Sequence, residues 1–365
     1  MKKIGIYTFW NVPNYGTFAQ AYALQKIISS RYPNILCRQI GYLDKRHYRS
    51  YYSVFKGRPW HREFYINLIS SIMPNSNVKN KRKKFLEAYK TIPHICVSNK
   101  EQVKSEEFDV VVIGSDIVWD YSIPIFNRDK LLFGIGFNSK KIVSYAASFG
   151  TVQESAKHPQ YVVNGINKMN AISVRDDKSQ RIVDSVTGKI PPLVLDPTWL
   201  WDFSSDENIK QVPYKDYIIV YGQDFSDDFI QQVIRYAHEK KLTIICLDCN
   251  NDNYKWCDIV IKQHELSSYE WIAMFKYADL IATSTFHGIT FSLIFNKKFA
   301  FAKTNFVLAK CENFLKEIDL YDRFVTNDNV ELMFEQEWDY NFINAVIEKK
   351  KMTSFAYLDK VLLEG

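Results

Sequence analysis

The sequence lacks the long apolar segment of a membrane-spanning protein. No apolar run approaches the roughly 18–20 residues that a helix needs to cross a bilayer. Residues 1–7 contain two lysines, but they lack the long apolar region and the small-residue cleavage site of a secretory signal. We interpret this segment as a first β-strand and expect a cytoplasmic protein.

Several motifs of common enzyme classes are also missing. The chain contains no Gly-x-Gly-x-x-Gly fingerprint, no Walker loop and no Gly-x-Ser-x-Gly elbow. These absences disfavour hydride transfer, nucleotide hydrolysis and serine-hydrolase chemistry.

The six cysteines show no spacing that is typical of a disulfide framework. Cys246, Cys249 and Cys257, followed by His264, have the ligand types of a zinc site. However, Cys246 lies within the apolar run 242–247, which is patterned as a buried strand. A thiol in such a run is more often a small core residue, so we expect no metal.

The positive charge is concentrated in one region. The formal net charge is +6, and residues 79–84 read Lys-Asn-Lys-Arg-Lys-Lys. Basic and aromatic residues also alternate through 45–64. Such a region suits a nucleic acid, an anionic membrane surface or a charged glycan carrier, or else it is a solvated helical face. No nucleic-acid-binding motif is present, so we expect no nucleic-acid partner.

Strand and helix patterns alternate almost throughout, which predicts an α/β fold with parallel sheets. We expect two Rossmann-like, doubly wound domains that face each other across a cleft. They cover residues 1–200, with a basic aromatic insertion at about 44–95, and residues 212–335; helices in 336–365 pack back across both. The predicted strands are 3–9, 35–40, 110–114, 141–146, 171–174, 193–195, 217–221, 243–247, 259–261, 280–282 and 299–301. The predicted helices include 17–29, 81–90, 154–169 and 340–363.

Ligands of such folds bind at the carboxyl ends of the strands, so residues just after strands are the candidates. The first loop contains Asn14, Tyr15, Gly16 and Thr17; Asn14 and Gly16 suit a tight turn and Thr17 suits a helix N-cap. Three further predicted strands are followed by candidate residues: Ser115 and Asp116 after the first, Ser148 after the second and Arg175 after the third. Arg175 either grips a carboxylate or phosphate, or pairs with the neighbouring Asp176 and Asp177.

The most informative segment is Thr283-Ser284-Thr285-Phe286-His287-Gly288, between a short strand pattern and an apolar helical run. His287 and Gly288 are therefore expected at a strand-to-helix turn, where free N–H groups and the helix dipole attract an anion. An imidazole there suits acid chemistry on an anionic substrate. The alternative is that His287 caps the helix or forms a hydrogen bond in the core.

Taken together, these motifs resemble the polysaccharide pyruvyl transferase family, in order from about residue 4 to about residue 302. The residues that carry the resemblance are Asn14-Tyr15-Gly16-Thr17 with 20–25, Gly114-Ser115-Asp116 with Trp119, 144–150, Ser173-Val174-Arg175, Leu195-Asp196-Pro197-Thr198 and Phe286-His287-Gly288 with Phe291-Ser292. The resemblance implies a fold similar to the two-domain GT-B glycosyltransferases.

The resemblance also implies transfer of a carboxyethylidene group from phosphoenolpyruvate to two hydroxyls of one sugar, which forms a cyclic pyruvate ketal. By analogy, His287 is the general acid or assists phosphate departure, Arg175 holds the donor, and Asp116 acts on an acceptor hydroxyl. The substrate-binding candidates are Asn14, Tyr15, Gly16, Thr17, Ser115, Ser148, Ser284, Thr285, Phe286 and Gly288. No cofactor besides the donor is implied.

The implied acceptor is a bacterial surface glycan or its lipid-linked precursor, with peripheral contact at the inner membrane face through the basic insertion. Two alternatives remain open on the same scaffold. One is a glycosyltransferase that uses a nucleotide sugar, and the other is a non-catalytic glycan-binding protein. The pyruvyl transferase hypothesis depends on His287 and Arg175, which are far apart along the chain, meeting across the shared cleft.

Overall fold

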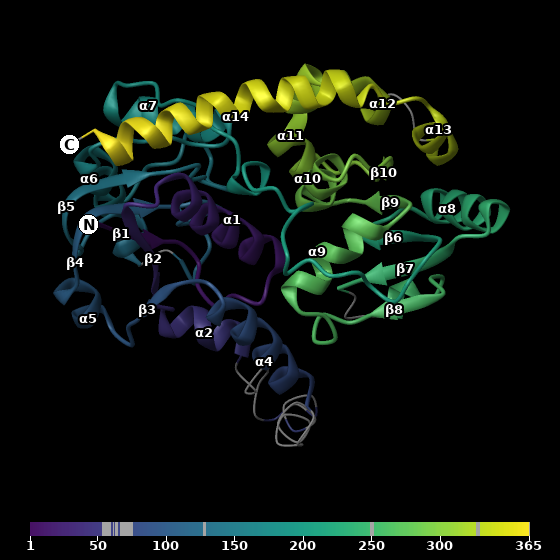
Figure 1. Cartoon of the computed structure of the whole chain (residues 1–365), viewed down its shortest axis with the longest axis horizontal. Helices are drawn as coiled ribbons and strands as arrows, with labels where there is room; N and C mark the ends of the chain where they lie inside the picture. The colour runs from purple at the N-terminus through teal and green to yellow at the C-terminus, as the bar shows by residue number, and fades with distance from the viewer. Residues whose placement is uncertain are drawn as a thin grey trace. The chain divides into compact units, whose positions relative to one another are not determined.

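A computed structural model of the protein describes residues 1–52, 60, 62, 65, 76–126, 129–248, 252–325 and 329–364 (Figure 1). It divides into two compact units, Met1–Trp201 with Lys350–Gly365, and Asp202–Lys349. Each unit is built on a five-stranded parallel sheet. The predicted α/β class with two parallel-sheet, Rossmann-like domains is therefore confirmed.

The first unit has the strand order β3-β2-β1-β4-β5. These strands are β1 (Lys2–Tyr7), β2 (Ile35–Gly41), β3 (His94–Cys96), β4 (Glu107–Ile113) and β5 (Asn138–Ser144). The helices are α1 (Tyr15–Arg31), α2 (Lys45–Tyr52), α4 (Asn77–Lys90), α5 (Lys100–Ser105), α6 (Gln160–Lys168) and α7 (Asp177–Thr187), with short 3₁₀ turns η1 (Lys130–Phe133) and η2 (Pro197–Trp199).

The side chains of β4, an inner strand, are buried on both faces of this sheet. Successive side chains of a strand point to opposite sides. Val111 and Ile113 pack in the core that α5, α6 and α7 share, whereas Val110 and Val112 pack against α1 and the end of the last helix. A run of apolar residues without alternation is what two buried faces require, and this is the pattern that predicted the strand.

The second unit repeats the same arrangement with the order β10-β9-β6-β7-β8. Its strands are β6 (Tyr217–Tyr221), β7 (Thr243–Leu247), β8 (Ile259–Ile261), β9 (Leu280–Thr283) and β10 (Phe299–Phe301). Its helices are α8 (Asp227–Lys240), α9 (Ser268–Tyr277), α10 (Phe286–Ile294), α11 (Asn305–Glu317), α12 (Tyr321–Val325) and α13 (Val330–Glu335), with the 3₁₀ turn η3 (Asp252–Tyr254). In each unit the first and fourth strands along the chain are neighbours, so the topological switch points lie between β1 and β4 and between β6 and β9.

The last helix, α14 (Tyr340–Leu363), has residues in both units. In the second unit, the hydroxyl of Tyr340 donates to the carbonyl of Lys297 at 2.6 Å. In the first unit, the hydroxyl of Tyr357 donates to the carbonyl of Ser144 at 2.7 Å, and Leu358 is fully buried. The polar and apolar contacts of its second half therefore make this half of α14 an integral part of the first unit, whereas the first half belongs to the second unit.

Several predicted boundaries are wrong. The helix predicted at 17–29 begins at Tyr15, and its N-cap is Asn14 and not Thr17, because the Asn14 side chain accepts from the backbone N–H of Thr17. The helix predicted at 154–169 begins only at Gln160, after Pro159. The strands predicted at 171–174 and 193–195 are isolated bridges, such as the one between Val174 and Leu193.

Other predictions concern the cysteines and the basic insertion. Cys246 is buried in β7, as the apolar pattern predicted, whereas Cys249 lies outside the described residues. The described part of the chain contains no group of three or more His, Cys, Asp and Glu residues placed to hold a metal. Part of the basic aromatic insertion, including Phe55, Lys56, Arg58 and Phe64, also lies outside the described residues. None of the helices described here is long and apolar enough to cross a membrane.

Gly114 directly follows β4 in a conformation that requires glycine. Its φ is +124°, and a Cβ added there would lie 2.3 Å from the carbonyl oxygen of Tyr145. Gly188, which ends α7, also has a positive φ of +66°, but a Cβ there would meet nothing within 4 Å. Comparing the two positions therefore separates the cost of the backbone conformation from the cost of the steric collision.

We predict that Gly114→Ala lowers the free energy of unfolding of the first unit by roughly 3 kcal/mol or more, because it adds a collision to an unfavourable φ. The matched control Gly188→Ala should cost only about 1 kcal/mol. Urea unfolding followed by circular dichroism measures both. Equal losses would show that the collision is relieved and that the backbone conformation alone sets the cost.

His47 anchors α2 within the first unit. Its ring packs edge-to-face against Phe126, with ring centroids 4.4 Å apart, and against Phe9 at 5.2 Å. The side chain is buried, and its Nε2 atom has no hydrogen-bond partner among the described residues. Burial lowers the pKa of His47 to about 4, although Asp129 and Asp44 oppose the shift. The imidazole is therefore neutral when the unit is folded near neutral pH.

We predict that His47 makes the first unit less stable in mild acid. An unfolded histidine titrates near pH 6.5, so between about pH 6.5 and pH 4 the unfolded chain binds a proton that the folded chain does not. The unfolding free energy should fall by roughly 3 kcal/mol over this interval and level off below it. In His47→Gln this part of the pH dependence should disappear, whereas the exposed His238→Gln should retain it. Urea titrations between pH 4 and 7 measure it.

Candidate functional site

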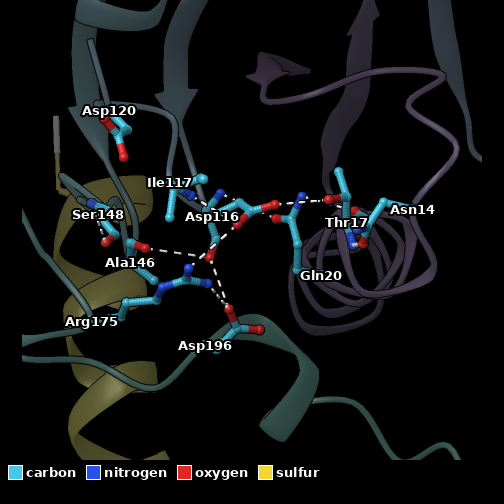
Figure 2. A network of polar contacts seen from close by, with 12 residues as sticks. Asn14, Thr17, Gln20, Asp116, Ile117, Asp120, Ala146, Ser148, Arg175 and Asp196 are labelled. Carbon is cyan, nitrogen blue, oxygen red and sulfur yellow. Dashed lines mark hydrogen bonds and ion pairs between the residues drawn. The ribbon is translucent and has the colours of Figure 1, made fainter. Parts of the chain in front are cut away.

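The first candidate site lies at the switch point of the first unit, where β1 and β4 end side by side. A polar network there joins residues from α1, the loop after β4, the segment before α7 and η2 (Figure 2). Its charged members are Asp116, Arg175 and Asp196. This is the edge of the sheet at which doubly wound folds bind their ligands.

Arg175 is the centre of this network. Its Nη1 donates to Oδ2 of Asp196 at 2.6 Å, and its Nη2 donates to Oδ1 of Asp116 at 3.3 Å (Figure 2). Only 9% of the Arg175 side chain is exposed. Arg175 thus forms ion pairs with Asp116 and Asp196, whereas the side chain of the adjacent Asp176 caps α7 by accepting from the N–H of Ser179.

The two carboxylates differ in what surrounds them. The Asp196 side chain is 1% exposed; its Oδ2 also accepts from Ser115, and its Oδ1 accepts from the N–H and hydroxyl of Thr198. The Asp116 side chain is 13% exposed. Its Oδ2 accepts from the Thr17 hydroxyl at 2.9 Å, and its Oδ1 accepts from the N–H of Ile117 at 2.8 Å. Asp196 is thus a buried support, and Asp116 is the carboxylate nearer to solvent.

The backbone around Asp116 is held in an uncommon conformation. Asp116 has φ +77° and Ala146, at the end of β5, has φ +53°. Non-glycine residues adopt this region at a cost of about 1 kcal/mol or more, and such residues cluster at functional sites. The loop carrying Asp116 is fixed further by Gln20, whose Oε1 accepts from the N–H of Ser115 and whose Nε2 donates to the carbonyl of Thr17.

The charges of this network favour a ligand with hydroxyl groups. Burial lowers the pKa of Arg175, but the carboxylates of Asp196 and Asp116 outweigh it, so that the pKa is raised and the guanidinium stays charged. One guanidinium faces two carboxylates, which leaves the network with a net negative charge. An anion would have to compete with Asp116 and Asp196 for Arg175, whereas a hydroxyl could donate to Asp116.

The remaining first-unit candidates cap or pack the segments that carry this network. Asn14 is exposed and caps α1, and Tyr15 is buried with its ring 4.9 Å from that of Phe85. Ser115 is fully buried, and the Oγ of Ser148 accepts from the N–H of Gly150. Gly16 is buried in the first turn of α1.

Two members of the network, Gln20 and Asp196, were not among the predicted site residues. Both belong to segments that carried the family resemblance, and Asp196 stands before a proline, where a short polar residue typically caps a turn. That signal could identify Asp196 as a cap, but not as the partner of a distant arginine.

The second candidate site lies at the switch point of the second unit, between the ends of β6 and β9. The strand ends at Thr283 and α10 begins at Phe286, so the predicted strand-to-helix turn is present. The N-cap is Thr285, whose side chain accepts from the N–H of Gly288 at 2.9 Å. His287 therefore does not cap the helix; it lies in the first turn, half-buried, with its ring 5.4 Å from that of Phe286.

Ser284 holds this turn against the loop after β6. Its Oγ accepts from the N–H of Gln223 at 2.8 Å and donates to the carbonyl of the same residue at 2.6 Å. A Cβ on Gly222 would lie 2.1 Å from that Oγ, and a Cβ on Gly288 would lie 2.0 Å from Oγ1 of Thr283. Gly222 thus permits a close approach of the two segments, and Gly288 lets the first turn of α10 pack closely on the end of β9. The convergence of His287 with Arg175, which lies in the other unit, stays a prediction.

The sequence model of the polysaccharide pyruvyl transferase family matches residues 14–302. This range begins at the N-cap of α1 and ends just after β10, so it contains both candidate sites. A comparison with curated protein sequences finds no match.

Three solved structures are similar to this chain at low sequence identity. A structure from Listeria monocytogenes assigned as a UDP-N-acetylglucosamine 2-epimerase is 8% identical, with a TM-score of 0.54, and the match covers 100% of this chain and 98% of that one. The UDP-GlcNAc 2-epimerase of Methanocaldococcus jannaschii is 13% identical (TM-score 0.49; 98% and 100% covered), and the E. coli heptosyltransferase WaaC with ADP is 10% identical (TM-score 0.40; 95% and 99% covered). The first of these supports the predicted two-domain, GT-B-like fold.

We predict that the two aspartates of the network contribute differently to the stability of the first unit. Asp196→Asn should lower the unfolding free energy of the first unit by about 2–4 kcal/mol, because it removes the buried partner of Arg175. Asp116→Asn, which removes a longer contact at a more exposed position, should cost only about 1 kcal/mol. Thermal and urea unfolding of the two variants measure the difference. The reverse order would show that Asp116 is the structural partner.

Proposed function

Because the chain belongs to the polysaccharide pyruvyl transferase family, we propose that it transfers a carboxyethylidene group from phosphoenolpyruvate to two hydroxyls of one sugar. The proposed acceptor is a bacterial surface glycan or its lipid-linked precursor. The observation that carries the proposal is the family match over 14–302, within which the candidate residues stand at the two switch points. The proposal requires no cofactor besides the donor.

The proposed reaction begins with protonation of the methylene carbon of phosphoenolpyruvate. Positive charge then develops at the neighbouring carbon, and one sugar hydroxyl attacks it and loses its proton. The second hydroxyl attacks the same carbon as the bond to phosphate breaks. Two C–O bonds and one C–H bond form, one C–O bond to phosphate breaks, and the two hydroxyl protons regenerate the acid and accompany the inorganic phosphate.

In this proposal, Asp116 receives the acceptor hydroxyl. Its carboxylate is already fixed by Thr17, Ile117 and Arg175, and it is the more exposed of the two carboxylates of the network. A general base that is held in place before the substrate arrives loses little entropy when it acts. The contacts of Arg175 favour a positioning role for its guanidinium, with the predicted grip on the donor as the alternative role.

The proposed role of His287 is to protonate the donor or to assist the departure of phosphate. It occupies the second position of α10, a helix of nine residues whose first turn also includes Gly288. The N–H groups of a first helical turn and the positive end of the helix dipole stabilise an anionic group. The N–H groups of Ser284, Thr285 and Gly288 already donate within the protein. In this proposal it is therefore the positive end of the α10 dipole that holds the negatively charged donor while the imidazole transfers a proton.

We predict that label from phosphoenolpyruvate carrying ¹⁴C in its carbon skeleton enters the glycan, with one inorganic phosphate released for each ketal formed. Because a positioned general acid contributes about 10²–10⁴-fold, His287→Gln should reduce the rate by that factor, and Asp116→Asn should reduce it comparably. Scintillation counting of the isolated glycan and a phosphate assay measure the two products.

The matched control is His238→Gln, the same substitution at an exposed position of α8 in the same unit. It should retain full activity, and all variants should show the unfolding transition of the parent protein. Transfer that survives both His287→Gln and Asp116→Asn would contradict the assigned roles. Thermal stabilisation by a nucleotide sugar, without any by phosphoenolpyruvate, would instead favour a glycosyltransferase.

A further inference from the structure

Two helices of the first unit carry a net positive charge that is larger than the net charge of the whole protein. Together α2 and α4 contain nine of the 47 Lys and Arg residues and one of the 41 Asp and Glu residues, so the remainder of the chain is slightly acidic. Neither helix contains a candidate residue of the sites described above. Their charge is therefore a separate feature of the molecule.

The basic side chains lie on the outside of these helices. In α4, Phe85 and Tyr89 are fully buried, whereas Lys83 and Lys90 are exposed. Because Lys83 and Lys90 are seven residues apart, they lie on one face of the helix, away from the buried residues. In α2, Lys45, Arg46 and Arg49 are exposed, while His47 and Tyr52 are buried.

The two helices form one surface, because the guanidinium of Arg82 in α4 lies over the ring of Tyr48 in α2, 5.4 Å from its centroid. We call this the α2–α4 basic surface. Its exposed basic residues are Lys45, Arg46, Arg49, Lys79, Arg82, Lys83 and Lys90.

Exposed aromatic residues follow α2 in the chain. The side chain of Trp60 is 74% exposed and that of Tyr65 is 54% exposed. Trp and Tyr are the residues enriched at the boundary between lipid and water, and basic residues are attracted to anionic headgroups. The combination suits a bilayer better than a protein partner, whose interface core is depleted of lysine.

The same helices also contact the loop that leads into the first-unit network. The hydroxyl of Tyr52 donates to the carbonyl of Asn11 at 3.0 Å, and the hydroxyl of Tyr89 donates to the carbonyl of Val12 at 3.4 Å. That loop continues into Asn14, the N-cap of α1, and α1 supplies Thr17 to Asp116. The helices that carry the α2–α4 basic surface are thus packed, through buried tyrosines on their other face, on the loop that leads to the candidate site.

We infer that the α2–α4 basic surface docks the protein on an anionic phospholipid bilayer. The inference rests on charge, exposure and packing; it fits the lipid-linked acceptor of the proposed function but does not need the donor assignment. Docking would hold a membrane-bound acceptor near the unit that contains Asp116.

Co-sedimentation with vesicles tests the inference. The protein should bind vesicles that are one-third phosphatidylglycerol and two-thirds phosphatidylcholine, and it should not bind phosphatidylcholine alone. Each basic residue near an anionic bilayer strengthens binding roughly fivefold, so Arg49→Glu/Lys83→Glu/Lys90→Glu should weaken it at least about a hundredfold. Trp60→Ala should weaken binding by a smaller factor that changes little with salt, whereas binding of the parent protein should fall steeply as salt is added.

The matched control is Lys215→Glu/Arg235→Glu/Lys262→Glu, which makes the same charge change at exposed positions of the second unit. This control should retain binding within about threefold. Equal losses of binding in both triple variants would show that only the net charge of the protein matters, and would overturn the inference. Absence of binding to anionic vesicles would overturn it too, as would single-stranded RNA that displaces the protein from them. Transfer to a soluble acceptor should be unchanged in the α2–α4 variant, so a failure of docking and a failure of the proposed reaction are distinguishable.

Discussion

The buried ion pair between Arg175 and Asp196 is the constraint on which the first unit's switch point depends. Arg175 follows the bridge at Val174, and Asp196 begins η2, so the pair ties two irregular segments together beyond the edge of the sheet. Burying these charges is costly unless they are paired and their remaining hydrogen-bonding groups are satisfied. Here Ser115 and Thr198 satisfy Asp196. The second bond of Arg175, together with those from Thr17 and Ile117, then holds Asp116, the more exposed carboxylate, in a fixed orientation.

The two switch points offer complementary chemistry, although they share one topology. The first presents carboxylates that accept from hydroxyls, and its net charge is negative. The second presents the first turn of α10, where a hydroxyl cap at Thr285 and a glycine at position 288 leave a compact, carboxylate-free turn beside His287. A sugar hydroxyl and an anionic donor need these two different environments. The roles assigned to the two sites in the proposed reaction therefore follow from the polar groups that lie just after the strands of each unit.

The sequence predicted the sheets better than it predicted the site. The strands 217–221, 243–247, 259–261 and 299–301 agree with the structure at both ends, because short apolar runs bounded by polar residues are a local signal. The predicted helix 340–363 also agrees. Thr17 was wrong as an N-cap because both Asn14 and Thr17 are good caps, and only the fold shows that the Thr17 hydroxyl is used by Asp116. The partners of Arg175 were missed for a similar reason: they lie 21 and 59 residues away, and strand order alone brings them together.

The uneven distribution of charge has a consequence for how the first unit meets a large acceptor. The helices α2 and α4, which carry a basic surface, are packed on the loop before Asn14, while the network that this loop approaches is negatively charged. An acceptor that carries anionic groups at one end and free sugar hydroxyls at the other would be oriented by this arrangement. Its anionic end is attracted to the helices and excluded from the carboxylates, and its hydroxyls are left for Asp116. The helices α2 and α4, inserted between β2 and β3, would thus orient such an acceptor at the candidate site of the first unit.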